Sequence, residues 1–197
     1  MHNQGLYLRG VRRKYRKSSL AISHPNMINQ DFTAKEVNQI WFGDITYIPT
    51  HEGNLYCSVF IDCFSRKIVG YSIKDHMRES IVIDSLISAI QRENPKPGSI
   101  IHTDHGSQYT GYRFYEAIKE NRCIHSHSRK GNPYDNTVLE SFYKSFKQEV
   151  FPKRQYKTKS LALFDILDYL ENYYNKRFHS SLGYQTPYEF SLLTKSA

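Results

Sequence analysis

Alternating hydrophobic and polar residues run through the first half of the chain and predict three β-strands. Residues 41–50 and 55–62 are separated by a turn-forming His-Glu-Gly-Asn segment at 51–54, and a third run covers residues 67–73. β-Branched and aromatic residues dominate these runs, and both kinds favour strands. Because the connections are short, we expect the three strands to form an antiparallel meander.

The second half of the chain mostly shows the spacing of helices. Apolar residues between 80 and 92 recur at helical intervals, and an Asn-Pro-Lys-Pro-Gly segment ends that helix. Further helices are expected at residues 109–121, 137–150 and 161–174 and after Pro187, with short strands at 99–103 and 123–127. This order predicts an α/β fold, a mixed five-stranded sheet with helices on both faces.

The net charge of the chain indicates a kind of binding partner. The chain has 27 Lys and Arg against 19 Asp and Glu, a formal net charge of +8. Such an excess favours nucleic acid as a partner, although a moderately basic domain can also simply be soluble. Basic residues gather in segment 1–35, where we expect Arg12, Arg13 and Lys14 to contact DNA phosphates.

Cysteine usage and hydropathy exclude several classes of protein. Cys57, Cys63 and Cys123 show no paired spacing, so no structural zinc site is expected and we interpret them as small buried hydrophobic residues. No apolar run approaches the roughly 18–20 residues of a membrane span, and no secretory signal is recognisable. We therefore expect a cytoplasmic protein without a membrane partner.

Three carboxylates carry the candidate chemistry. Asp44 interrupts a strand, Asp104 follows a later strand, and Glu140 lies in the first turn of a helix, thirty-five residues after Asp104. Alone, each has an ordinary explanation as an outward-facing, turn or dipole-complementing residue. Together they can hold two cations about 3.5–4 Å apart, which clamp the attacking and leaving oxygens of a phosphodiester. Oxygen ligands favour hard cations, so we expect two Mg²⁺ ions, with Mn²⁺ as a substitute.

The helix that begins near Thr137 also carries basic side chains. Glu140, Lys144 and Lys147 stand at i, i+4 and i+7 and share one face, while apolar residues occupy most of the rest. A carboxylate followed by two ammonium groups suits a metal ligand with phosphate contacts beside it. We expect Lys144 and Lys147 to contact DNA.

Other polar residues near the trio are interpreted as follows. Arg129 and Lys130 are expected to contact DNA, and Asp62, the main competing carboxylate, is interpreted as a turn residue. His102 and His105 are expected to pack or to contact substrate rather than to bind metal. The Asp135-Asn136 pair is expected to cap the helix that follows it.

These segments together resemble the catalytic subunit of bacterial transposases of the insertion sequence 3 family, which are relatives of retroviral integrases. The resemblance runs from about residue 26 to residue 190. It rests on five motifs in order: WFGDITYIPT, VFIDCFSRKIVGYSI, HTDHGSQYT, SRKGNPYDNTVLESFYKSFKQE and YYNKRFHSSLGYQTPYEF. It implies an RNase H-like fold with Asp44, Asp104 and Glu140 as catalytic metal ligands and Lys147 as a contact to terminal DNA.

The same resemblance implies roles for the neighbouring segments. Residues 106–109 would shape the loop beside the second aspartate, and residues 132–136 would form a mobile loop before the catalytic helix. Asn175, Arg177 and His179 would have a structural or DNA-contact role.

The implied organisation has three parts. A basic arm covers residues 1–35, the catalytic core covers 36–150, and a helical extension of the core covers 151–197. Family members carry a further helical region before such an arm, and this chain begins after it. We therefore expect an integrase core with a short basic arm.

The implied activity is that of a DNA polynucleotidyl transferase, which cleaves element ends and transfers the strand to target DNA. Relatives act as multimers, so we expect at least a dimer on DNA, with a helix-turn-helix partner of the OrfA type as a further candidate. Two alternatives stay open. The chain can be a catalytically silent DNA-binding remnant or inhibitor of a longer transposase, or the same fold can serve a simple nuclease.

Overall fold

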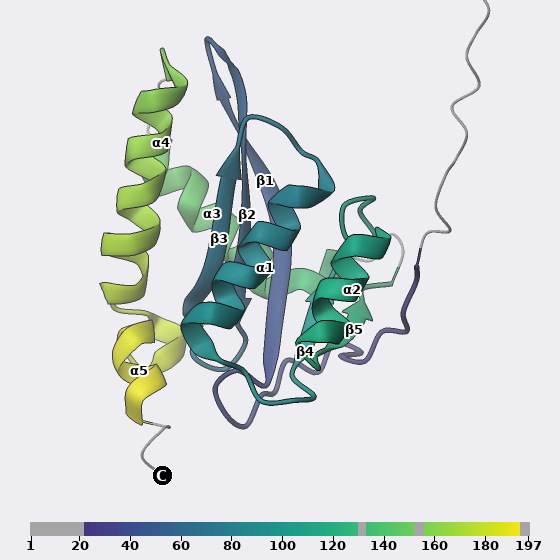
Figure 1. Cartoon of the computed structure of the whole chain (residues 1–197). Coiled ribbons are helices and arrows are strands. Elements are labelled where there is room, and N and C mark those ends of the chain that lie inside the picture. The colour runs from purple at the N-terminus through teal and green to yellow at the C-terminus, as the bar shows by residue number, and fades with distance from the viewer. Residues whose placement is uncertain (1–21, 130–132, 152–155, 194–197) are drawn as a thin grey trace, which may run out of the picture.

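Five strands form a single mixed sheet at the centre of the molecule (Figure 1). The computed structural model describes residues 22–129, 133–151 and 156–193. The strand order across the sheet is β3-β2-β1-β4-β5. The strands are β1 (Ile40–Thr50), β2 (Gly53–Asp62), β3 (Ile68–Lys74), β4 (Ile100–Thr103) and β5 (Ile124–His127).

The predicted meander is confirmed, because β1 pairs antiparallel with β2, and β2 with β3. β4 and β5 add on the other side of β1 and run parallel to it. The predicted boundaries agree with the observed ones to within two residues, since alternation and tight turns fix both ends of each strand. Asp62 is the turn residue expected of it, accepting hydrogen bonds from the Ser65 amide and hydroxyl at 2.8 and 2.6 Å.

Helices cover both faces of this sheet, as predicted. They are α1 (Glu79–Glu93), α2 (Tyr112–Glu120), α3 (Thr137–Val150), α4 (Lys159–Asp168) and α5 (Pro187–Leu193). In the described parts of the chain, no helix is long and apolar enough to cross a membrane.

Two of the predicted helices differ from the observed ones. The helix expected at 109–121 begins at Tyr112, because Tyr109 and Thr110 form a turn back to the carbonyl of Gly106. The helix expected at 161–174 begins earlier, where the Thr158 side chain accepts from the Leu161 amide, and passes into a π-helical turn over Tyr169–Tyr173.

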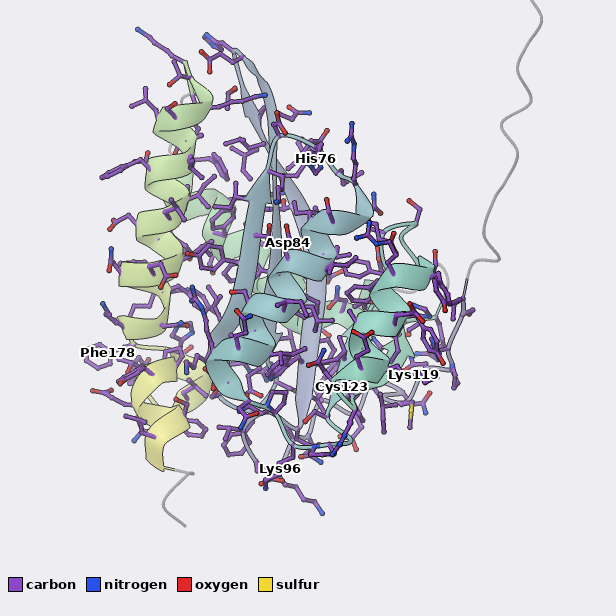
Figure 2. All side chains as sticks on the ribbon, in the orientation of Figure 1. His76, Asp84, Lys96, Lys119, Cys123 and Phe178 are labelled. Carbon is purple, nitrogen blue, oxygen red and sulfur yellow. The ribbon has the colours of Figure 1, made fainter. Side chains whose placement is uncertain are left out.

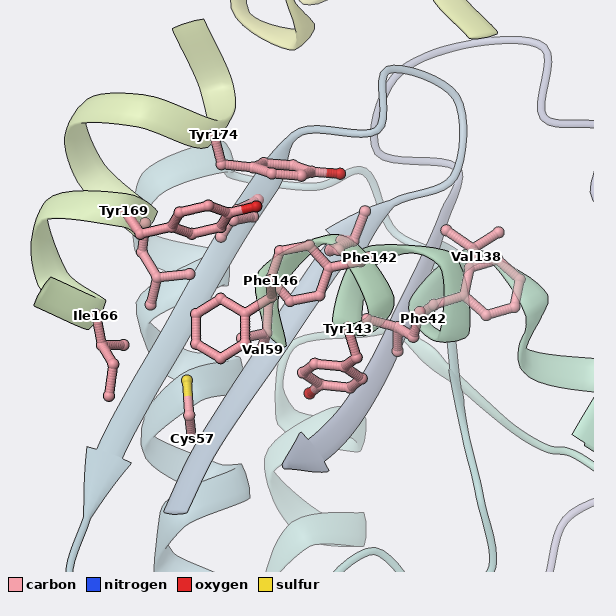
Figure 3. Close-up of a cluster of buried hydrophobic side chains, with 14 of the residues drawn as sticks. Phe42, Cys57, Val59, Val138, Phe142, Tyr143, Phe146, Ile166, Tyr169 and Tyr174 are labelled. Carbon is pink, nitrogen blue, oxygen red and sulfur yellow. The ribbon is translucent and has the colours of Figure 1, made fainter. Parts of the chain in front are cut away.

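A separate hydrophobic cluster lies on each face. α1 and α2 pack against one face around Trp41, Phe60 and Ile101. α3 and α4 pack against the other, where Phe142 and Phe146 interleave with strand residues (Figure 3). Each such side chain contributes about 1.5–3 kcal/mol when fully buried.

The cysteines belong mostly to this interior. Cys57 and Cys63 are buried and Cys123 is partly buried, and all three are free thiols. Their interpretation as small buried hydrophobic residues is confirmed for the first two.

The described part of the expected arm, residues 22–35, has no helix or strand but runs along β5. The amide of His24 donates to His127 Nδ1 at 3.0 Å, and the amide of Met27 donates to Ser126 Oγ at 2.9 Å. Ile28 is buried in the α3-side cluster. Arg12, Arg13 and Lys14 lie outside the described residues, so their DNA contacts stay a prediction.

The carboxyl-terminal extension is fastened to the opposite edge of the sheet. The Asn175 side chain accepts from the Ile68 amide at 2.8 Å and donates to the Ile68 carbonyl at 3.1 Å. These two hydrogen bonds give Asn175 a structural role, one of the two that the sequence left open. Phe178, by contrast, projects from the surface with 69% of its area exposed (Figure 2).

Candidate active site

Asp44 and Asp104 are brought together by the parallel pairing of β1 and β4. Gly43 pairs with Thr103 in that ladder, so the two aspartates occupy the next position on neighbouring chain segments. Neighbouring strands lie about 4.8 Å apart. Asp104 directly follows β4, and its Oδ1 accepts from the Gly106 amide at 2.8 Å. A Cβ on Gly106 would lie 2.9 Å from that same oxygen, so glycine allows the tight turn.

Glu140 is placed over this pair by α3. It lies in the first turn of the helix and is exposed, with no hydrogen bond or ion pair to any described residue. Tyr143, one turn further on, donates its hydroxyl to the main-chain carbonyl of Asp44 at 2.8 Å. That bond joins the helix that carries Glu140 to the strand that carries Asp44.

Burial and the negative charges of Asp104 and Glu140 all raise the pKa of Asp44. Burial, first, and then the negative charge of Asp104 raise the pKa of Asp44 to about 7, with a smaller contribution from Glu140. A hydrogen bond from the Ile45 amide and the nearby Lys147 ammonium act in the opposite direction. The trio therefore lies within electrostatic reach of one another and holds more negative charge than its surroundings compensate.

The donor set fits a hard divalent cation. All three groups offer carboxylate oxygens, and a cation would neutralise the repulsion that raises the pKa of Asp44. Among the residues described, no three His, Cys, Asp or Glu side chains are already gathered tightly enough to hold a metal ion. Glu140, being exposed and unbonded, is the group with freedom to move toward the aspartates.

Lys144 and Lys147 share the exposed face of α3 with Glu140, as the helical spacing predicted. The Lys147 ammonium lies 5.8 Å from the centroid of the Tyr47 ring, and Tyr47 follows Asp44 by three residues in β1. The face thus presents one carboxylate and two ammonium groups to solvent. Their contact with DNA stays a prediction.

Arg129 is engaged within the chain rather than free. Its guanidinium donates to Asp135 from Nε at 3.1 Å and from Nη2 at 2.8 Å, and its amide donates to the same carboxylate at 2.7 Å. Half of the Arg129 side chain is exposed and Asp135 is fully buried. A DNA contact from the exposed part stays a prediction, and Lys130 lies outside the described residues.

The prediction that Asp135 and Asn136 cap α3 with their side chains is wrong. Asn136 occupies the cap position of α3, but its side chain makes no capping hydrogen bond. Both oxygens of Asp135 are taken by Arg129 and by the Asn26 amide group, which donates at 2.9 Å. Asp135 therefore ties the segment after β5 to residues 22–35 instead of closing the helix.

Asp135→Asn is expected to make this tie insensitive to acid. Hydrogen bonds from Arg129 lower the pKa of Asp135 to about 2. A carboxyl with a lowered folded-state pKa stabilises the fold fully above its unfolded pKa of about 4, and that contribution is lost as pH falls toward 2. The variant should lose roughly 1–2 kcal/mol of unfolding free energy at neutral pH.

Urea unfolding followed by circular dichroism from neutral to acidic pH measures this difference. It should shrink below about pH 4. Asp84→Asn, which removes a half-exposed ion pair with Lys74, is the control and should change little. A penalty for Asp135→Asn that stays constant down to the acid limit would contradict the assignment.

The histidines around Asp104 are packing residues, as expected for His102. His102 is buried, its Nδ1 lies 2.9 Å from Ser126 Oγ, and burial lowers its pKa to about 4. His105 packs against His127, with ring centroids 4.6 Å apart and the rings tilted by 35°. Burial and the neighbouring histidines lower the pKa of His125 to about 2 and that of His127 to about 4, so the His102, His125 and His127 rings are neutral at physiological pH.

Sequence reasoning missed two features of the site. The first is Tyr143, whose place three residues after Glu140 could have signalled that it faces β1. The second is a cleft beside α3, of mixed polar and apolar lining, that contains Arg66 and Arg177. No local pattern could reveal that cleft, because its residues come from distant segments.

Comparison with known proteins agrees with this geometry. The integrase core domain family matches residues 34–133, and a second integrase core domain family matches residues 121–187. The transposase for insertion sequence element IS904 of Lactococcus lactis is 47% identical over 194 residues, covering 96% of this chain and 77% of the relative. Transposase InsF for insertion sequence IS3A of Escherichia coli is 35% identical over 195 residues, covering 96% and 67%.

Solved structures show the same fold at low identity. The HTLV-2 integrase catalytic core domain in complex with magnesium superimposes with a TM-score of 0.64 at 18% identity, over 81% of this chain and 99% of that one. A chain of the simian T-cell lymphotropic virus intasome in complex with PP2A regulatory subunit B56 gamma gives a TM-score of 0.63 at 22% identity, over 87% of this chain and 59% of that one. The expectation of an RNase H-like, integrase-type core is confirmed.

Proposed function

The chain belongs to the insertion sequence 3 family of transposases, and on that premise we propose that it cleaves DNA at element ends and transfers the strand to a target. The observation that carries this proposal is the placement of Asp44 beside Asp104 and beneath Glu140, where burial together with these charges raises the pKa of Asp44 to about 7. A buried carboxylate with uncompensated neighbouring charge is expected where cations are to be bound.

Asp44, Asp104 and Glu140 would hold two Mg²⁺ ions in this proposal, with Mn²⁺ as a substitute. When bound, such ions activate the attacking hydroxyl and stabilise charge on the attacking and leaving oxygens of a phosphodiester. The β1–β4 ladder fixes the two aspartates, and the Tyr143 hydroxyl sets α3 relative to β1. No covalent bond between protein and DNA is required.

The exposed face of α3 would position the DNA. Lys144 and Lys147 follow Glu140 on that face and carry positive charge at successive turns. Phosphate contacts fix the register of a strand without reading its sequence, so these lysines would hold the scissile bond near the carboxylates.

Assembly on DNA is also proposed. Two element ends must be held together for joining, so at least a dimer is expected on DNA. Support comes from the relatives: one neighbour is part of a viral intasome, and the HTLV-2 core is described in dimeric and trimeric forms. A helix-turn-helix partner of the OrfA type would supply recognition of the terminal repeats.

A strand-transfer assay tests the function directly. The purified chain is incubated with a labelled duplex of the element end and target DNA, with Mg²⁺, with Mn²⁺ or with a chelator. Glu140→Gln should remove metal-dependent joined products, whereas Glu120→Gln, at an exposed position on α2, should leave them unchanged.

Each other outcome identifies an alternative. DNA binding without any joining favours a silent remnant or an inhibitor of a longer transposase. Cleavage without joining to a supplied 3′-hydroxyl favours a simple nuclease. Full joining by Glu140→Gln would show that the carboxylate assignment is wrong.

A further inference from the structure

A half-open cleft of about 330 Å³ lies beside α3, next to the face that carries Glu140. Four parts of the chain wall it: Phe32 of the segment before β1, α3, the turn after β2, and the segment that follows the π-helical turn. The residues that matter here are Ser141 and Ser145 of α3, Arg66 of the turn, and Tyr174, Arg177 and His179 of the later segment. The cleft is distinct from the carboxylate trio, because none of the three acids lines it.

The cleft side of α3 adjoins its lysine-bearing face. Successive residues of a helix are rotated by about 100°, so Ser141 and Ser145 form a stripe directly beside Glu140 and Lys144. Phe142 lies beyond that stripe and is buried against the sheet. The lysine-bearing face and the cleft therefore lie on adjoining sides of the same helix.

The cleft carries a surplus of positive charge. Arg66 lines it and has no hydrogen bond or ion pair from its guanidinium to any described residue. Arg177 pairs with Glu149 through Nη1 at 3.2 Å, and its buried Nε has no partner within the described chain. Two guanidinium groups thus line the cleft, whereas Glu149, which pairs with one of them, is not a lining residue.

Beside the arginines, the cleft has an apolar floor of Phe32, Val138 and Phe142 and a set of hydroxyl groups that suit an oxyanion. Ser141, Ser145 and Ser181 supply hydroxyl groups that can donate to its oxygens. The Arg177 guanidinium lies 5.3 Å from the centroid of the Tyr174 ring, which restricts its position. Arginine with hydroxyl donors is the combination that binds phosphate most specifically.

We propose that this cleft binds a backbone phosphate of DNA, away from the reacting bond. The proposal rests on DNA being the substrate, as the proposed function has it. Since Ser141 and Glu140 are adjacent on one rigid helix, a phosphate held in the cleft fixes the strand relative to the catalytic carboxylate. Arg177 and His179, whose role the sequence left open, then belong to a DNA-anchoring site.

DNA binding measured by fluorescence anisotropy in chelator tests this without requiring catalysis. Arg66→Gln removes the unpaired guanidinium, and Ser145→Asp places a negative charge in the cleft while both arginines remain. Arg122→Gln is the matched control, because Arg122 is exposed, lies after α2, and shares with Arg66 a left-handed backbone (φ 57° and 61°). Thermal unfolding of each variant verifies folding.

Loss of one phosphate contact reduces the slope of log K against log salt by about 0.9 and weakens binding about tenfold near 0.1 M salt. We expect this for Arg66→Gln and at least as much for Ser145→Asp, with no change for Arg122→Gln. Unchanged slopes for both cleft variants would overturn the proposal, whether or not the wild type joins strands.

Two further probes identify other occupants. Inorganic phosphate is titrated while the amide signals of Ser141 and Ser145 are followed by NMR, and a polyglutamate peptide is titrated in the same way. Shifts of these signals by the DNA duplex that are absent in Arg66→Gln support a backbone site. Shifts by free phosphate or by the peptide alone, with DNA binding unaffected, would replace DNA as the ligand and overturn the proposal.

Discussion

Asp44→Asn is expected to abolish strand joining and, in the same molecule, to make the fold more stable. The pKa of Asp44 is raised to about 7 from an ordinary value of 3.8, first by burial and then by Asp104. A carboxyl with a raised folded-state pKa costs stability once pH exceeds its unfolded pKa, and the cost grows until the folded pKa is passed. Neutral asparagine carries no such cost.

The stability gain should therefore depend on pH. In metal-free buffer it should be absent below about pH 4, grow between pH 4 and pH 7, and reach about 4 kcal/mol above pH 7. Joining should fall by roughly 10³-fold or more, because one of the groups that places charge at the reacting phosphate is lost.

Urea unfolding across this pH range, with and without Mg²⁺, measures the first effect. Added Mg²⁺ should stabilise the wild type and leave Asp44→Asn unchanged, since binding to the folded state alone raises its stability. Asp75→Asn, at an exposed position, is the control. A variant that is less stable than the wild type at pH 8 would mean that Asp44 serves the fold and not a cation site.

Gly70→Ala is expected to have the largest destabilising effect on the fold itself. A Cβ on Gly70 of β3 would lie 2.5 Å from the Ala89 amide nitrogen and 2.5 Å from the Ser85 carbonyl oxygen of α1. Both atoms are main chain, so the helix must move away from the sheet as a body. Such overpacking costs about 3 kcal/mol or more.

The displacement should also break a buried contact at the same turn of α1. Ser58 Oγ of β2 and Ser85 Oγ lie 2.7 Å apart, and that hydrogen bond is lost if the distance between α1 and the sheet increases. Ser72→Ala, on the same strand, is the control and should cost about 1 kcal/mol or less. Chemical denaturation measures both variants, and equal stabilities would show that α1 does not rest directly on the glycine.

Much of this architecture could be predicted because it depends on local patterns. Alternation and turn residues predicted the three antiparallel strands, and an amphipathic pattern predicted α3 from Thr137 to Val150 with its observed bounds. The parallel pairing of β1 with β4, which brings Asp44 beside Asp104, was not predicted, because the sequence pattern places each aspartate on its own strand without giving the order of the strands.

What could not be predicted depends on contacts between distant segments. The ion pair of Arg129 with Asp135 also holds Asn26, more than a hundred residues away, so a reading of the loop alone suggested a helix cap. The cleft likewise combines Arg66 with Arg177. No periodicity or spacing in the sequence indicates such contacts. They depend on how distant segments of the chain pack against one another.

Both outer strands of the sheet are protected from pairing with another molecule. At β3, the Asn175 amide occupies the main-chain donor and acceptor of Ile68, and at β5, the amide of His127 donates to the carbonyl of Pro25 at 3.4 Å. Open edges invite a foreign strand, so these contacts disfavour both aggregation and sheet extension. If copies assemble on DNA as proposed, these contacts favour an association through helix and loop surfaces, which can be reversed without disturbing the sheet.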